Sequence, residues 1–230
     1  SDQMQRYIRW RDEGYMSSTG HCFDIGNTVS QALERFVITG NPLSGSEHER
    51  SAGNGSLMRL APVPMYYYPE PQDIVEYAGE SSRTTHGAAE CVESCRLLGL
   101  LLFKAFEGNT KNEILFNNHE FNCQCSTVAS IATGEYRDKL QEDVRGTGYV
   151  IDSLEAALWS FYTTNNFKTA ILKAANLGDD ADTTAAICGQ IAGAYYGIDE
   201  IPADWIDKLA MRETIMQLSI ALLERKRHQA

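Results

Sequence analysis

The residues best suited to chemistry form one short acidic stretch between Asn176 and Ala185, where three carboxylates and two threonines follow a glycine. Hard divalent cations prefer oxygen ligands, and oxygens gathered on one tight turn can supply several of them to a single ion. Asp180, Asp182 and Thr183 are therefore candidate metal ligands. The alternative is that one Asp caps a helix and that the other carboxylates interact favourably with the positive end of the helix dipole. Three carboxylates within four positions repel each other, however, and a cation or a proton relieves such crowding.

A second candidate is the loop from Ser51 to Arg59, which contains Gly53, Asn54 and Gly55. Glycines permit positive-φ turns in which backbone N–H groups converge on an anion. The loop lacks the Gly-Lys-Ser/Thr sequence of a P-loop, so a plain tight turn before a helix is the alternative interpretation. Arg59 either neutralises a phosphate or pairs with a surface carboxylate.

Two further polar positions precede helical patterns. His86 comes just before a long apolar helix and either donates a hydrogen bond to a ligand oxygen or acts as a cap. Asp24 and Asn27 lie three residues apart at another helix start, where both side chains could reach ligand hydroxyls. For Asp24 the alternative is an ordinary N-cap.

Composition narrows the class of protein. The 230 residues carry a formal net charge of −11, which argues against nucleic acid or an anionic membrane as the main partner and suits a cation. With 43% hydrophobic residues and no linker, the chain predicts one domain over residues 1–230. Its six cysteines form no CxxC pair and no secretory segment is visible, so we expect a cytoplasmic protein. No apolar run is long enough to span a bilayer.

The hydrophobic pattern predicts an all-α fold, because apolar residues recur at helical spacing and strand alternation is nearly absent. Gly40 is expected to end the first of these helices, and Tyr66 to Pro71 to form a loop. A helix whose small residues recur every four positions should allow another backbone to approach closely. Arg225 to His228 is interpreted as a solvated helix end. The expected helices cover residues 25–39, 72 onward, 88–106, 127–133, 150–161, 185–197 and 202 onward, the last with an apolar stripe of Trp205, Leu209, Met216, Ile220 and Leu223.

Taken together and in order, these motifs are more specific than any one of them. The chain resembles the ADP-ribosylglycohydrolase family, of the dinitrogenase-reductase-activating glycohydrolase type, and the resemblance covers nearly the whole sequence. The segments that carry it are Asp24–Asn27, Gly53–Arg59, Thr85-His86, Gly148–Trp159 and Gly178–Thr183.

The resemblance implies a compact, orthogonal multi-helix fold with two magnesium or manganese ions at a cleft. It implies hydrolysis of the glycosidic bond between ADP-ribose and a modified side chain, often arginine, in a protein or a small conjugate. Asp180, Asp182 and Thr183 match the second metal motif of the family. The resemblance identifies no residue of this sequence as the catalytic acid or base. The residues implied to contact ADP-ribose or the leaving group are Asp24, Asn27, Ser51, Gly53, Asn54, Gly55 and His86.

The sequence departs from the family pattern at one point, because it contains no Thr-Asp-Asp, the first metal motif. We therefore expect a family member that lacks its N-terminal portion. A second hypothesis is a catalytically inactive ADP-ribose-binding or structural relative. A third is a magnesium-dependent prenyl-diphosphate enzyme, but Asp179 to Asp182 does not have the DDxxD spacing of that class and a second motif is missing.

Overall fold

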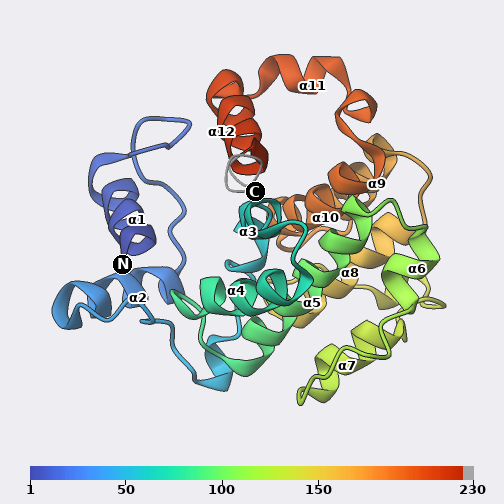
Figure 1. The fold of residues 1–230 in the computed structure, drawn as a ribbon, viewed down its shortest axis with the longest axis horizontal. Coiled ribbons are helices and arrows are strands. Elements are labelled where there is room, and N and C mark those ends of the chain that lie inside the picture. The colour runs from blue at the N-terminus through green and yellow to red at the C-terminus, as the bar shows by residue number, and fades with distance from the viewer. Residues whose placement is uncertain (225–230) are drawn as a thin grey trace.

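The computed structural model describes residues 1–224, so the basic run from Arg225 to His228 lies outside the described residues. Helices joined by loops make up this range (Figure 1). The described residues contain no strand, and the two isolated bridges pair Ser46 with His86 and Gly53 with Tyr149. The predicted all-α class is thereby confirmed. Between residues 1 and 224 no helix is long and apolar enough to cross a membrane.

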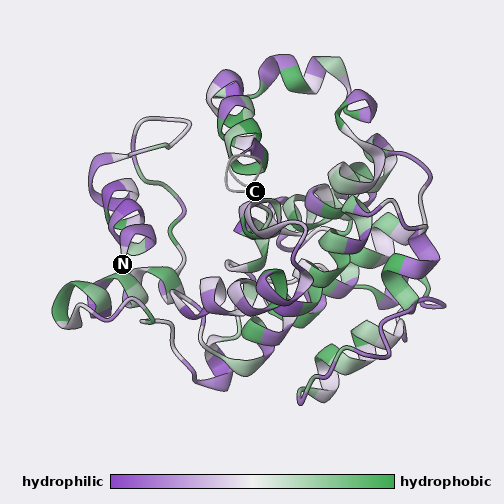
Figure 2. Cartoon of the chain, viewed as in Figure 1, coloured by the Kyte–Doolittle hydropathy of each residue, from purple (hydrophilic) through white to green (hydrophobic). Residues whose placement is uncertain are grey.

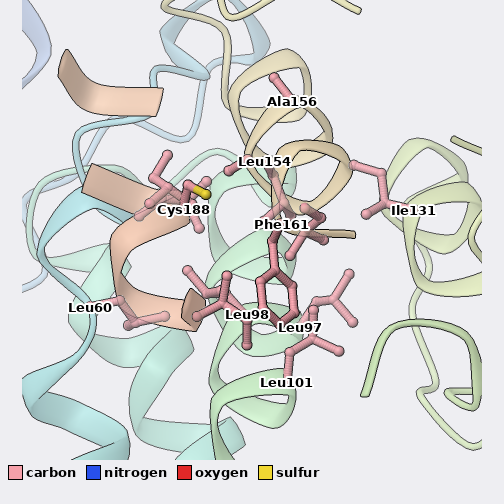
Figure 3. Packing of buried hydrophobic residues seen from close by; sticks show 14 of the residues in the cluster. Leu60, Leu97, Leu98, Leu101, Ile131, Leu154, Ala156, Phe161 and Cys188 are labelled. Atoms are coloured by element: carbon pink, nitrogen blue, oxygen red, sulfur yellow. The ribbon is translucent and has the colours of Figure 1, made fainter. Parts of the chain in front are cut away.

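The centre of the molecule is α5 (Ala89–Phe106), which the sequence predicted over nearly the same residues. It packs against α4 (Pro71–Arg83), α8 (Val150–Tyr162) and α10 (Ala181–Tyr196). Apolar side chains on several sides of α5 are buried, as expected for a helix surrounded by others. Figure 3 shows three of them, Leu97, Leu98 and Leu101, packed with Phe161 of α8 and Cys188 of α10.

Shorter elements surround this centre. Four 3₁₀ turns are η1 (Glu49–Ser51), η2 (Leu57–Arg59), η3 (Gln141–Asp143) and η4 (Ile198–Glu200). The other α-helices are α1 (Asp2–Glu13), α2 (Asn27–Thr39), α3 (Pro62–Tyr67), α6 (Lys111–Phe116), α7 (Ser126–Thr133), α9 (Phe167–Ala175), α11 (Ala203–Lys208) and α12 (Arg212–Glu224).

Helices α1 and α2 have a small core of their own. Met4, Leu33 and Phe36 are buried against each other and do not belong to the main hydrophobic cluster. In Figure 1 the two helices lie together at one end of the molecule, beside α4. The guanidinium of Arg59, 5.0 Å from the ring centroid of Tyr7, is one of the links to the rest of the chain.

The start of α2 differs from the prediction that Asp24 caps it. The helix begins at Asn27 with Gly26 in the N-cap position, and no side chain caps it. Asp24 has a φ of 49°, so the backbone is already turned away from the helix before Gly26. The predicted end at Gly40 is confirmed, because this glycine has the left-handed φ of 70° that ends many helices.

The region from Pro202 onward forms two helices in place of the predicted one. The first helix, α11, ends at Lys208. Met211 has a left-handed φ of 57°, and α12 starts at the next residue. Trp205 packs against the main cluster, but the remaining stripe is wrong as a prediction of core. The side chains that are 39–50% exposed are Leu209, Met216, Ile220 and Leu223. Figure 2 shows hydrophobic segments along α12.

Two other expectations are met only in part. The segment from Tyr66 to Pro71 is partly helical, because Pro62 favours a helix start and α3 extends to Tyr67. The small-residue face of α10 contacts side chains in place of a backbone: a Cβ on Gly189 would lie 3.6 Å from Ile171 Cδ1 of α9. The small residues of α10 therefore let α9 pack closely, and side chains of α9 fill the contact between the two helices.

Candidate functional site

The acidic turn and the glycine loop meet through one hydrogen bond. Asn54 Nδ2 donates to Asp180 Oδ2 over 2.8 Å, although the two residues are 126 positions apart. Asp180 occupies the N-cap position of α10, yet its side chain makes no capping bond. Its backbone N–H donates to the Gly146 carbonyl over 2.8 Å. The structure therefore places the turn by its backbone and leaves the carboxylate facing Asn54.

Asn54 is fixed from several directions. Its side chain is buried, and Nδ2 also lies 2.7 Å from Ser153 Oγ of α8. Its backbone N–H donates to the Gly148 carbonyl over 3.2 Å, next to the bridge between Gly53 and Tyr149. These bonds hold the glycine loop against the start of α8 and so determine where Asp180 can lie.

The other two predicted metal ligands follow directly on α10. The side chain of Asp182 is exposed and makes no hydrogen bond with any residue from 1 to 224. Thr183 is nearly buried, and the partner of its Oγ1 is Met58 Sδ at 3.8 Å. Two carboxylates and a hydroxyl are donors that suit a hard divalent cation. They are fewer than the six or more oxygens that such an ion takes, and nowhere in the described part of the chain do three His, Cys, Asp or Glu side chains form a metal-binding group.

His86 lies on the other side of the glycine loop and is only 2% exposed. Its Nδ1 lies 2.8 Å from Thr85 Oγ1, which accepts a 2.8 Å hydrogen bond from Arg59 Nη2. A guanidinium can only donate, and within residues 1–224 the buried Thr85 hydroxyl has no acceptor for its hydrogen other than Nδ1, which assigns the ring proton of the neutral imidazole to Nε2. Burial and, to a smaller extent, the charge of Arg59 together lower the pKa of His86 to about 4. At neutral pH the imidazole is therefore an uncharged donor.

The glycine loop contacts this imidazole closely. A Cβ on Gly55 would lie 3.0 Å from His86 Cε1 and 3.2 Å from Nε2, and one on Gly53 would lie 3.6 Å from Nε2. A side chain at position 55 would force the ring to shift, whereas the distance at Gly53 is an ordinary van der Waals contact. Ser51 Oγ bonds Ser46 Oγ over 3.0 Å, next to the backbone bridge that joins residues 46 and 86.

Asp24 and Asn27 are not brought into contact with these groups. Both are exposed, and neither side chain has a hydrogen-bond partner among residues 1–224. The first turn of α2 is nevertheless close, because a Cβ on Gly55 would lie 3.9 Å from Val29 Cγ2. The first turn of α2, which begins at Asn27, therefore lies beside the glycine loop.

Arg59 forms no ion pair with a carboxylate among residues 1–224 and donates to neutral oxygens. Its Nη2 donates to the Ser81 carbonyl over 3.1 Å and to Thr84 Oγ1 over 3.3 Å, in addition to Thr85. The guanidinium therefore holds the C-terminal end of α4 and the short segment after it, which contains His86.

The sequence analysis did not identify Ser153, which connects the glycine loop to the segment before α8. Its Oγ donates to the Thr147 carbonyl over 2.6 Å while accepting from Asn54. Thr147 Oγ1 in turn donates to Asp152 Oδ2 over 2.7 Å. The segment from 148 to 159 was among those that carry the family resemblance, and its polar first turn was the available signal.

Comparison with known proteins gives a consistent result. The chain matches the ADP-ribosylglycohydrolase family over residues 1–230. It is 42% identical over 215 residues to "ADP-ribosylarginine hydrolase Tri1" of Serratia proteamaculans, covering 94% of this chain and 58% of that protein. It is 29% identical over 191 residues to "ADP-ribosyl-[dinitrogen reductase] glycohydrolase" of Rhodospirillum rubrum, covering 82% of this chain and 61% of that protein.

A solved structure agrees in fold. An "ADP-ribosylglycohydrolase-related protein complex" superposes with a TM-score of 0.82 at 37% identity, covering 97% of this chain and 73% of the solved one. The chain spans about 58% of the length of the Serratia relative.

Proposed function

The chain belongs to the ADP-ribosylglycohydrolase family, and we propose that it hydrolyses the bond between ADP-ribose and a modified arginine side chain. The relatives named as an ADP-ribosylarginine hydrolase and an ADP-ribosyl-[dinitrogen reductase] glycohydrolase support this substrate class. The observation that carries the proposal is the 2.8 Å bond between Asn54 and Asp180, which joins the glycine loop to the acidic turn. In the reaction, water adds to the anomeric carbon of the ribose, and the bond to the guanidine nitrogen breaks.

Asp180, Asp182 and Thr183 would hold magnesium or manganese, and the family resemblance implies two ions in the complete site. A bound ion of this kind polarises substrate oxygens and lowers the pKa of water. The role of Asn54 is to orient Asp180: its amide donates to Oδ2 and leaves the other carboxylate oxygen free. Thr183 presents its hydroxyl one residue after the exposed carboxylate of Asp182.

The glycine loop and His86 would bind the ADP-ribose. Gly53 and Gly55 let the backbone come close to the ribose and diphosphate, with Ser51 at the start of the loop. His86 Nε2–H is a neutral donor fixed in direction by Thr85, so it can donate to a ligand oxygen without a change of charge. Asp24 and Asn27 would contact the distal ribose or the leaving group.

The test is release of ADP-ribose from an ADP-ribosyl-arginine conjugate, with and without magnesium. We expect magnesium-dependent release that the Asp180→Ala/Asp182→Ala variant loses. Glu135→Gln is the control, because this carboxylate is exposed and makes no hydrogen bond within residues 1–224. Metal-dependent release that persists in the Asp182→Ala variant would exclude Asp182 as a metal ligand.

A second candidate function is ADP-ribose binding without hydrolysis, by an inactive or structural family member. It is favoured by the small number of acidic ligands, since residues 1–224 form no group of three or more that could hold a metal. Calorimetry with free ADP-ribose separates the two functions. Binding with no release from the conjugate would support the second, and release would support the first.

A further inference from the structure

A pocket lies beside the acidic turn and has no part in the site described above. It has a volume of about 560 Å³, within the range of ligand pockets. Two segments form it, the turn that precedes Asp180 and the stretch around η3, and the bond from Asp180 N–H to the Gly146 carbonyl ties these segments together. Its lining residues are Gln141, Glu142, Val144, Arg145, Asn176, Leu177 and Asp179.

The polar side chains of this pocket are all exposed, and none makes a hydrogen bond or ion pair with another residue between 1 and 224. The apolar contribution comes from Val144, which is buried, and Leu177, which is half-buried. Five of the seven lining residues are polar, so the pocket is more polar than a typical small-molecule site and suits a charged or hydrogen-bonding partner. The unpaired polar residues are Gln141, Glu142, Arg145, Asn176 and Asp179.

Asp179 is held in a conformation that a glycine would adopt without strain. Its φ is 52°, directly after Gly178 with a φ of 82°. The left-handed conformation is unfavourable for an ordinary L-residue, and less so for Asp. Its side chain makes no hydrogen bond with the described residues that would compensate for this cost. A carboxylate is thus kept at the pocket where glycine would fit the backbone better.

From these observations, and resting on the proposed function, we propose that the pocket binds the polypeptide that flanks the modified arginine of an ADP-ribosylated protein, and that it selects basic flanking residues. The amides of Asn176 and Gln141 can pair with peptide backbone groups. Glu142 and Asp179 outnumber the one cation, Arg145, so the pocket attracts positive side chains. The net charge of −11 acts in the same direction.

The proposal can be tested by binding, independently of turnover. The probes are two peptides with one ADP-ribosylated arginine, flanked by two lysines or by two glutamates, and free ADP-ribose. In both peptides carbon replaces the glycosidic nitrogen, which prevents hydrolysis. We expect the lysine peptide to bind about tenfold more tightly than the glutamate peptide, as complementary charge would give.

The variants are Asp179→Gly, which keeps a residue suited to the left-handed backbone, and Glu142→Gln on the other segment. Each should reduce the affinity ratio by about threefold, the effect of one exposed charge pair, and leave the affinity for free ADP-ribose unchanged. Glu135→Gln, a matched loss of an exposed and unpaired carboxylate outside the pocket, should keep the full ratio.

Equal affinities for the two peptides, or a ratio that neither pocket variant changes, would overturn the proposal. If free ADP-ribose binds in that case, the proposed function is unaffected. If free ADP-ribose does not bind while the lysine peptide is still selected through Glu142 and Asp179, the pocket is supported and the proposed function fails.

Discussion

At the scale of single residues, the environment of His86 determines both its tautomer and its charge. The buried ring has a pKa of about 4, below the 6.5 of an exposed histidine. The folded state therefore binds fewer protons than the unfolded state between these values. Above pH 6.5 the group adds nothing to stability. As the pH falls through 6.5 the unfolded state gains a proton first, so stability is lost until the folded pKa is passed.

This gives the first prediction. Between pH 7 and pH 4.5, His86 should reduce the free energy of unfolding by about 2.5 kcal/mol. Urea denaturation of the wild type and of His86→Gln at both pH values measures it, and the difference between the two proteins removes the contribution of the carboxylates. Parallel losses in both proteins would mean that His86 titrates normally in the folded state.

The contact between Gly55 and His86 leads to the second prediction. The Cβ in Gly55→Ala would meet Cε1 at 3.0 Å, and the ring cannot move freely because Thr85 holds Nδ1. We expect a loss of roughly 1–3 kcal/mol in the free energy of unfolding, typical of overpacking, and weaker ADP-ribose binding. Gly193→Ala is the control, because its Cβ would meet only Phe167 Cε2 at 3.9 Å, an ordinary van der Waals distance. Equal effects of the two substitutions would show that the ring yields.

At the scale of elements, α6 depends on a reciprocal cap. Thr110 Oγ1 accepts from the Glu113 backbone N–H over 3.4 Å, and Glu113 Oε2 accepts from the Thr110 N–H over 2.8 Å. The third prediction is that Thr110→Ala lowers the free energy of unfolding by about 1 kcal/mol, while Thr110→Ser changes it by less than about half of that. Thermal unfolding of both variants measures it, and equal stability of the Ala and Ser proteins would mean that the cap contributes nothing.

The same cap is visible in the sequence, although the helix that it starts was not predicted. Thr110 and Glu113 have the T-x-x-E spacing of a capping box, yet α6 was not predicted because its apolar run is short. The helix from 89 to 106 was predicted because its periodicity is long and Gly108 follows it. The break at Met211 left no signal, because the apolar pattern continues through a residue that tertiary structure puts in a left-handed conformation.

The candidate site shows the same limit. Residue types and spacing identified Asp180 and Asn54 as separate candidates, because each lies in a distinctive local sequence. Their hydrogen bond depends on where α8 and α10 cross, and local patterns carry no such information. The family resemblance, which rests on the order of motifs along the whole chain, was what placed them in one site.

At the scale of the whole molecule, two hydrophobic clusters of unequal size divide residues 1–224. The small one in α1 and α2 has only Met4, Leu33 and Phe36 as fully buried members. Few buried contacts mean a low free energy of local opening. The backbone amides of α1 and α2 should therefore exchange with deuterium faster than those of α5, which lies in the main cluster.

This division determines how the roles of Asp24 and Asn27 can be tested. Both precede or begin α2, the helix of the small cluster, and Val29 of the same turn approaches the glycine loop. If the two side chains contact ADP-ribose, the bound ligand must stabilise α2 against local opening. The gain equals the free energy of the contacts that the ligand makes with these two side chains. The fourth prediction is that ADP-ribose slows hydrogen exchange in α1 and α2 as well as in the glycine loop, and that Asp24→Ala/Asn27→Ala removes the protection of the helices alone. Protection confined to the loop in the wild type would place both residues outside the binding site.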